Sequence, residues 1–162
     1  MRKVTFLLFL AAAAWLRAAP EYAQMGPDIY DPQADGIKQI TETIQRAKMD
    51  HKHVLIVFGA NWCIWCRRLH STFENNESVR KELKRDFIVV NVDVNHRDGK
   101  KRNAEANKRY GDPMKKGLPV LVVLDWDGHQ LTTQETGVLE NGKSGHDPEK
   151  LVAFLKNWAP ER

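Results

Sequence analysis

Residues 54–66 read VLIVFGANWCIWC, an unbroken apolar run followed by two cysteines three positions apart. An apolar run that ends at Gly59 is typical of a β-strand covered on both faces, because a wetted face would place polar residues at alternate positions. The cysteines come directly after this strand and begin a segment with helical character. The sequence therefore predicts a buried strand, a short turn and a helix that begins at the cysteine pair.

The flanking sequence predicts further strands and the helices that cover them. Runs similar to the first occupy residues 87–93 and 119–124, and an Asp-Gly pair at 127–128 predicts a hairpin into a strand at 130–133. Strands buried on both faces require helices on both sides of the sheet. Those helices are predicted at 35–47, 63–71, 78–85, 104–110 and 147–158. We expect an α/β fold with a mixed sheet of four or five strands sandwiched by helices.

The first residues have the three parts of a secretory signal peptide: a basic start, a short apolar middle and a small-residue end. As a helix, the apolar part would span about 20 Å, too little for a hydrocarbon core of about 30 Å. We therefore predict a signal peptide over residues 1–19, with the cleavage point anywhere between residues 14 and 23, rather than a membrane anchor. Residues 20–34 would form an extended arm, either a flexible tether or a strip packed on the domain. Residues 35–162 would form a single domain.

The composition limits the classes of partner. The 162 residues include 25 basic and 21 acidic ones, a net charge of +4, but the predicted signal peptide holds three of the basic residues and no acidic one. The remaining chain is nearly neutral and has no basic stripe interleaved with aromatic residues, so nucleic acid is not a predicted partner. We expect a monomer without a cofactor, periplasmic or secreted.

The position of the two cysteines is typical of a redox pair. Cys63 stands at the start of the predicted helix, where unpaired N–H groups and the helix dipole lower the pKa of a thiol and favour the nucleophilic thiolate. Cys66 lies one turn further along the same side and can close a disulfide on Cys63. The pair can therefore alternate between dithiol and disulfide through a mixed disulfide with a client.

Two other interpretations of the pair remain open. A purely structural bridge is the weaker one, because a disulfide that closes so small a loop constrains the unfolded chain little. A copper or zinc site could use Cys63, Cys66 and His70, although the sequence places no obvious fourth ligand nearby. Haem attachment is excluded, because Arg67 stands where that motif needs histidine. The other histidines are predicted to be solvated: His51, His53, His96, His129 and His146.

Over residues 35–159 the chain resembles thioredoxin-like proteins, and more narrowly the exported bacterial proteins with a thioredoxin domain. The resemblance rests on residues 54–66, on the strand at 89–93 and on Gly117-Leu118-Pro119 before the next strand. It implies a thiol–disulfide oxidoreductase whose catalytic residues are Cys63 and Cys66, with protein disulfides or thiols as clients.

The resemblance also implies four client-binding residues. Pro119 resembles the family's cis-proline, which faces the disulfide, and the alternative is an ordinary trans proline at a strand start. Leu118 would then supply backbone contacts to a client strand, and Trp62 would pack beside Cys63. Trp65 is predicted to contact clients, although its ring could simply cover the sulfurs.

The chain departs from thioredoxin at positions that bear on direction. Val57 and Val89 stand where thioredoxin has a buried aspartate and a lysine, which help to move a proton to and from the buried cysteine, so this departure argues against an efficient general reductase. The residues between the cysteines, Ile64 and Trp65, include no histidine whose positive charge would make the pair a strong oxidant. We therefore expect a disulfide reductase supplied with electrons by a membrane thiol donor, the alternative being a redox-inactive client-binding or chaperone module.

Overall fold

The structure, a computed structural model, describes residues 23–97 and 99–161. Its centre is a four-stranded sheet in the order β2–β1–β3–β4. The strands are β1 (His53–Gly59), β2 (Phe87–Asp93), β3 (Val120–Leu124) and β4 (Gln130–Glu135). Strand β1 pairs parallel with β2 and antiparallel with β3, and β3 pairs antiparallel with β4 through the predicted hairpin. The predicted mixed α/β sheet is confirmed.

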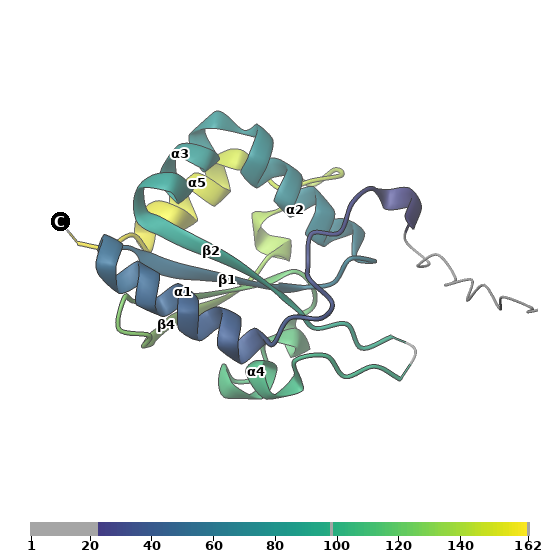
Figure 1. The fold of residues 1–162 in the computed structure, drawn as a ribbon. Coiled ribbons are helices and arrows are strands. Elements are labelled where there is room, and N and C mark those ends of the chain that lie inside the picture. The colour runs from purple at the N-terminus through teal and green to yellow at the C-terminus, as the bar shows by residue number, and fades with distance from the viewer. Residues whose placement is uncertain (1–22, 98, 162) are drawn as a thin grey trace, which may run out of the picture.

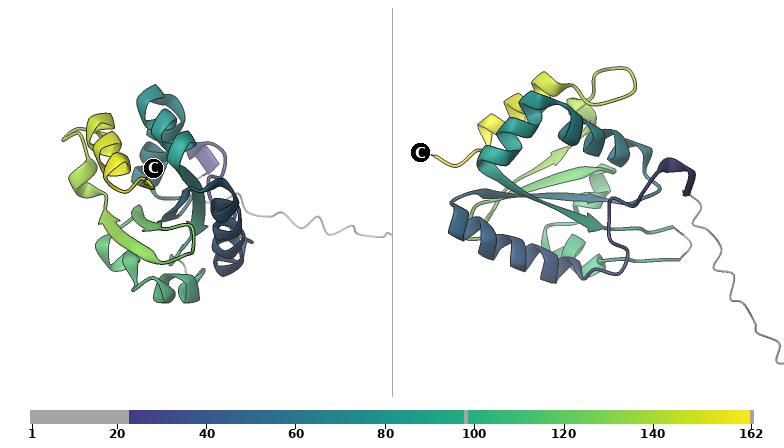
Figure 2. Two further views of the ribbon diagram at one scale, coloured as in Figure 1. Left: turned by 90° about the vertical axis from the view of Figure 1, so that its left-hand side faces the viewer. Right: turned by 45° about the horizontal axis from the view of Figure 1, so that its top comes forward.

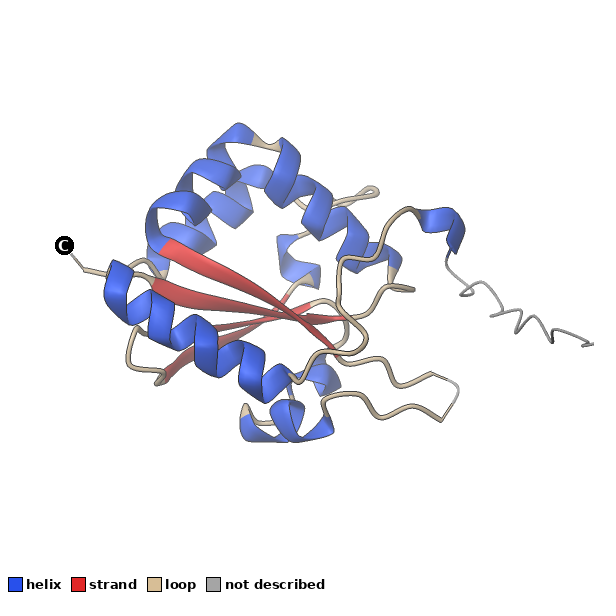
Figure 3. Ribbon diagram, viewed as in Figure 1, coloured by secondary structure: helices blue, strands red, loops and turns tan. Residues whose placement is uncertain are grey.

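Helices cover both faces of the sheet, as the buried strands require. Helices α1 (Gly36–Asp50) and α4 (Ala104–Arg109) lie on one face, and α2 (Ile64–Asn75), α3 (Glu77–Asp86) and α5 (Pro148–Asn157) lie on the other (Figures 1 and 3). Figure 2 shows the same two layers from other directions. Successive residues of β1 alternate between the two cores, with Leu55 and Val57 facing α2 and α5, and Ile56 and Phe58 facing α1.

Aspartate side chains cap the starts of two of these helices. The Asp35 carboxylate accepts a hydrogen bond from Lys38 N at 3.1 Å, and the Asp147 carboxylate accepts from the first turn of α5, which begins with proline. Three short 3-10 helices occupy the connections: Ala23–Met25, Pro113–Lys116 and Gly137–Leu139. The second of them leads directly into the turn before β3, which forms part of the site.

Strand β2 is less buried than its apolar sequence predicts. Val89 is 36% exposed and Asn91 is half-buried, whereas every residue of β1 and β3 is buried. The reason is that β2 is an edge strand of the sheet and that α2 and α3 do not cover it completely. They leave an opening of about 350 Å³ lined by Val89, Asn91 and residues of both helices. A mostly apolar run does not by itself reveal which strand lies at the edge.

The part of the arm that the structure describes is a packed strip. Tyr30 is buried, and the Asn61 side chain accepts hydrogen bonds from Ile29 N and Tyr30 N, both at 2.9 Å, and donates one to Tyr30 O at 2.8 Å. Arg67 of α2 donates to the carbonyls of Met25 and Pro27. The arm therefore passes the N-terminal end of α2 before α1 begins (Figure 1).

The predicted signal peptide, residues 1–19, lies outside the described residues. Within residues 23–97 and 99–161, none of the helices combines the length and the apolar character needed to cross a bilayer.

Candidate active site

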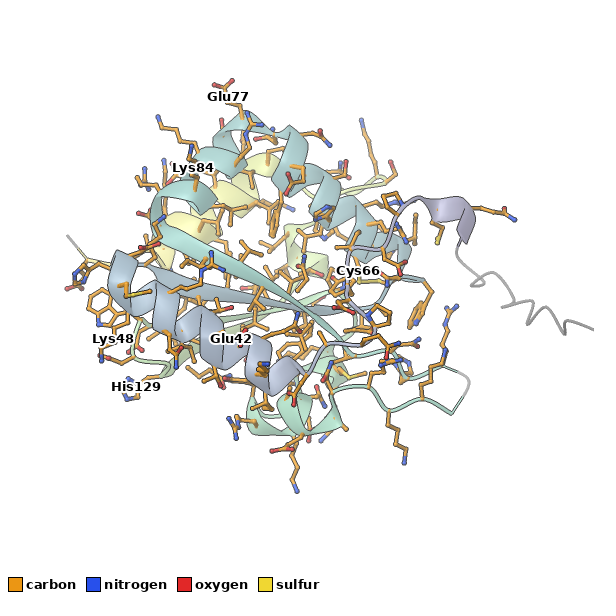
Figure 4. All side chains as sticks on the ribbon, in the orientation of Figure 1. Glu42, Lys48, Cys66, Glu77, Lys84 and His129 are labelled. Atoms are coloured by element: carbon orange, nitrogen blue, oxygen red, sulfur yellow. A yellow bond between two sulfur atoms is a disulfide. The ribbon has the colours of Figure 1, made fainter. Side chains whose placement is uncertain are left out.

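The two cysteines lie where β1 gives way to α2. Cys63 is the N-cap of that helix, so its sulfur accepts a hydrogen bond from Cys66 N at 3.2 Å. The pair forms a disulfide with 5.2 Å between the Cα atoms, and the two residues are only 5% and 1% exposed. In Figure 4, Cys66 lies at the opposite end of the sheet from Lys48 and His129. A thiolate at Cys63 would face the positive end of the helix dipole, and Cys66 would be the sheltered partner.

The predicted Leu118–Pro119 element faces the disulfide across the end of the sheet. The peptide bond between these residues is cis, and Cys63 Sγ lies 3.6 Å from Leu118 O. The Thr136 hydroxyl, which is itself buried, donates a 2.7 Å hydrogen bond to Pro119 O. This bond fixes the start of β3 and leaves the half-buried Leu118 beside the sulfur.

The two tryptophans that flank the cysteines each meet an arginine and a histidine. Trp62 donates from its indole N–H to Asn95 Oδ1 at 2.9 Å, and Arg97 lies 3.6 Å from its ring centroid. His96 meets the same ring edge-on. Trp62, His96 and Arg97 line a groove of about 410 Å³ that also reaches Cys63 and Leu118. The structure thus brings four of the six candidates, Trp62, Cys63, Trp65 and Leu118, together around one opening, whereas Cys66 and Pro119 are buried and do not line it.

Trp65 lies on the other side of the disulfide. Arg68 lies over its ring, 4.6 Å from the centroid, and His146 meets it edge-on at 5.8 Å. Trp65 is only half-buried and, with Ile64 at 43% exposed, lines the same groove. An aromatic ring at the edge of the groove can contact a bound client directly.

Two of the histidines predicted to be solvated are buried, and that prediction was wrong for them. His53 is 8% exposed and its Nδ1 donates to Trp158 O at 2.8 Å, while His146 is 3% exposed. Both ring nitrogens of His146 lack a hydrogen-bond partner within the described part of the chain. Burial, followed by the positive charge of Arg68, lowers the pKa of His146 to about 4.

The buried imidazole predicts an acid-sensitive fold. In the unfolded chain His146 regains an ordinary pKa of about 6.5, so the unfolded state binds a proton that the folded state refuses. Stability that is present above about pH 6.5 is therefore lost as the pH falls towards 4, by about 3 kcal/mol. Urea unfolding across this range should show the loss in the natural chain and not in a His146→Phe variant. An equal loss in both would show that other groups carry it.

The structure does not assemble the metal site that could have used His70. This residue lines the opening between α2, α3 and β2, whereas Cys63 lines the groove at the end of the sheet. In residues 23–97 and 99–161 no group of three or more histidine, cysteine or carboxylate side chains is arranged to hold a metal ion.

Several residues of the site escaped the sequence analysis. Asn61 holds the arm, Tyr30 reaches the space behind Cys66, and Arg68 and Arg97 lie over the tryptophans. The sequence signal for Asn61 was its place directly before the Trp-Cys motif, after a strand predicted to be buried, because a buried amide needs several hydrogen-bond partners. Nothing in the sequence around Tyr30 indicated that it would lie near the cysteine pair.

Several known sequences are similar to this chain. A model of a family described as thioredoxin-like matches residues 35–125. The thiol:disulfide interchange protein DsbD of Colwellia psychrerythraea is 28% identical over 104 residues, which are 64% of this chain and 16% of that protein. Mouse nucleoredoxin is 23% identical over 111 residues, which are 57% of this chain and 25% of that protein. The chain thus spans a quarter or less of these two relatives.

Two solved structures are also similar to this chain. The disulphide isomerase of Xylella fastidiosa Temecula1 is 34% identical with a TM-score of 0.68, and the match covers 80% of this chain and 95% of that one. The C-terminal domain of Neisseria meningitidis DsbD, in its reduced form, shares the fold with 20% identity and a TM-score of 0.53, over 76% of this chain and 97% of that one.

Proposed function

The chain belongs to the thioredoxin-like family, and from that membership we propose that it is an exported thiol–disulfide oxidoreductase that acts on protein clients. The observation that carries the proposal is the Cys63–Cys66 disulfide, capped onto the start of α2 and open to a groove beside Leu118. The similarity to a disulphide isomerase and to a thiol:disulfide interchange protein supports the same class of reaction.

The roles of the two cysteines follow from their positions, because Cys63 lines the groove and Cys66 does not. The Cys63 thiolate attacks one sulfur of a client disulfide, and the other client sulfur leaves as a thiolate that takes up a proton. The mixed disulfide lies in the groove, where a client strand can reach the Leu118 carbonyl. Cys66 then loses its proton and attacks Cys63 Sγ, which expels the second client sulfur. Two electrons pass to the client, and the pair is left as the disulfide.

We propose reduction as the working direction. A positive charge beside the first cysteine would stabilise its thiolate and make the pair oxidising. The imidazole of His146, behind Trp65, has its pKa lowered to about 4 and is neutral at physiological pH, so it adds no such charge. Continuous reduction outside the cytoplasm also requires a membrane thiol donor that returns electrons to the pair.

The reduction potential tests the function and its direction in one measurement. Purified protein is equilibrated with glutathione buffers, and the fluorescence of Trp62 and Trp65, which flank the pair, reports its state. We expect a single transition near the thioredoxin value of about −270 mV. A potential near about −120 mV would overturn the proposed direction while leaving the oxidoreductase. The absence of any transition would contradict the oxidoreductase itself and favour a redox-inactive client-binding module built around the same groove.

A further inference from the structure

The resolving cysteine shares its space with a residue from the arm. A side-chain carbon placed on Gly59 would lie 2.8 Å from Cys66 Sγ and closer still to the Tyr30 hydroxyl. The hydroxyl and the sulfur therefore occupy adjoining space above Gly59, and both fit only because this residue has no side chain. The Tyr30 ring comes from 29 positions earlier in the chain and fills the gap that the glycine leaves in β1.

Hydrogen bonds to the backbone of Tyr30 hold its hydroxyl in position. Tyr30 is 1% exposed, and its backbone is fixed by two of the hydrogen bonds to Asn61. Among the described residues no group forms a hydrogen bond with this hydroxyl in the disulfide form. Opening the disulfide would give this hydroxyl, which lies beside the Cys66 sulfur, a neighbouring hydrogen-bond acceptor.

The surrounding charges keep the phenol protonated. Burial raises the pKa of Tyr30 well above its ordinary value, the Asp93 carboxylate raises it further, and the Arg67 guanidinium lowers it. Asp93 is paired with Gly59 in the register of β1 and β2, so its side chain projects from the same face of the sheet. The Tyr30 hydroxyl therefore remains a hydrogen-bond donor over the whole pH range in which cysteines ionise.

We propose that Tyr30 is a positioning residue for the resolving step, donating a hydrogen bond from its hydroxyl to the Cys66 sulfur once the disulfide is open. The proposal rests on the proposed function and adds a residue that its mechanism lacks. Strand β1 carries no acidic side chain behind the pair, so a neutral donor supplies the stabilisation of the thiolate.

The resolving step exchanges one sulfur–sulfur bond for another. In the mixed disulfide the Cys66 thiol gives its proton to solvent, and its thiolate accepts the hydrogen bond from Tyr30. The Cys66 sulfur forms the new bond to Cys63 Sγ, and the bond between Cys63 and the client sulfur breaks. The client sulfur leaves with the electron pair and is protonated by solvent. Tyr30 keeps its own proton throughout.

Removing the Tyr30 hydroxyl should change the rate of the resolving step in a way that depends on pH. In a Tyr30→Phe variant the pKa of Cys66 should rise by about one unit, so that the thiolate population at neutral pH falls about tenfold. The less stabilised thiolate is also intrinsically more nucleophilic, by about threefold, because nucleophilicity rises with pKa. Resolution should therefore be about threefold slower at pH 7 and about threefold faster once Cys66 is fully ionised, so that the two pH profiles cross.

The experiment follows the resolving step directly. Reduced full-length protein is mixed with dithiobis(nitrobenzoic acid), and the second equivalent of coloured thiolate, released when Cys66 attacks the mixed disulfide on Cys63, is timed from about pH 6 to pH 10. The matched control is Tyr110→Phe, which removes the hydroxyl of a buried tyrosine packed against Phe58 on the other face of the sheet. Thermal unfolding of each variant checks that it is folded.

Crossing profiles for Tyr30→Phe, with Tyr110→Phe matching the natural chain, would support the proposal. Coincident profiles for Tyr30→Phe and the natural chain would overturn it. So would a change by the same factor at every pH, or an equal change in the control, since either indicates packing alone. If the natural chain releases no second equivalent, the proposed function fails as well, which keeps the two failures distinguishable.

Discussion

Replacing Cys66 by serine should stop turnover and leave clients covalently attached to Cys63. The serine hydroxyl cannot attack the mixed disulfide, so the first half of the reaction proceeds and the second does not. We expect catalysed reduction of a protein disulfide to fall at least about a hundredfold. Non-reducing electrophoresis of extracts from cells that produce the variant should show client adducts that disappear when a thiol reductant is added.

The order of attack is tested by the reciprocal variant. Cys63→Ser should lose activity equally but form no adducts, because Cys66 is 1% exposed while Cys63 lines the groove. Adducts of equal amount in both variants would contradict the assigned roles. If the double serine variant still binds clients with unchanged affinity and neither single variant forms adducts, a client-binding module replaces the enzyme.

An Asn61→Ala substitution should cause the largest loss of stability outside the sheet. It removes the two hydrogen bonds that the side chain accepts from Ile29 N and Tyr30 N, and the one it donates to Tyr30 O. Because these backbone groups are buried or partly buried, leaving them unpaired costs about 4 kcal/mol in total, unless the arm detaches. Chemical denaturation should show this loss, and limited proteolysis should cut within residues 26–34.

Asn75→Ala is the matched control. Asn75 lies on α2, is exposed, and its amide donates only to the Ser71 hydroxyl, so its removal should change the free energy of unfolding by less than about 0.5 kcal/mol. If Asn61→Ala is as stable as this control and its arm resists protease, the hydrogen bonds do not hold the arm. A detached arm also removes Tyr30 from Cys66, so Asn61→Ala should shift the pH profile of resolution as Tyr30→Phe does.

Most of the fold follows from patterns within a few residues of one another. The apolar runs fixed the strands, and Asp35 and Asp147 marked the starts of α1 and α5. The spacing of Cys63 and Cys66 after the first strand identified the redox pair, because the start of a helix is the place where a thiol is most easily ionised. These features depend on residues that are close together in the sequence, so the sequence alone is enough to predict them.

The tertiary structure, and no local pattern, decided which distant groups surround that pair, and the resemblance to thioredoxin-like proteins had indicated only Leu118 and Pro119 among them. Leu118 meets Cys63 across 55 positions, Asn61 binds Tyr30 across 31, and His53 reaches Trp158 across 105. No periodicity encodes such contacts, so the burial of His146 and the exposure of Val89 at the sheet edge also went unpredicted. Gly59 shows the reason most clearly. In the sequence it is the residue that ends a strand, whereas in the fold its missing side chain is the space in which a tyrosine from the arm meets the resolving cysteine.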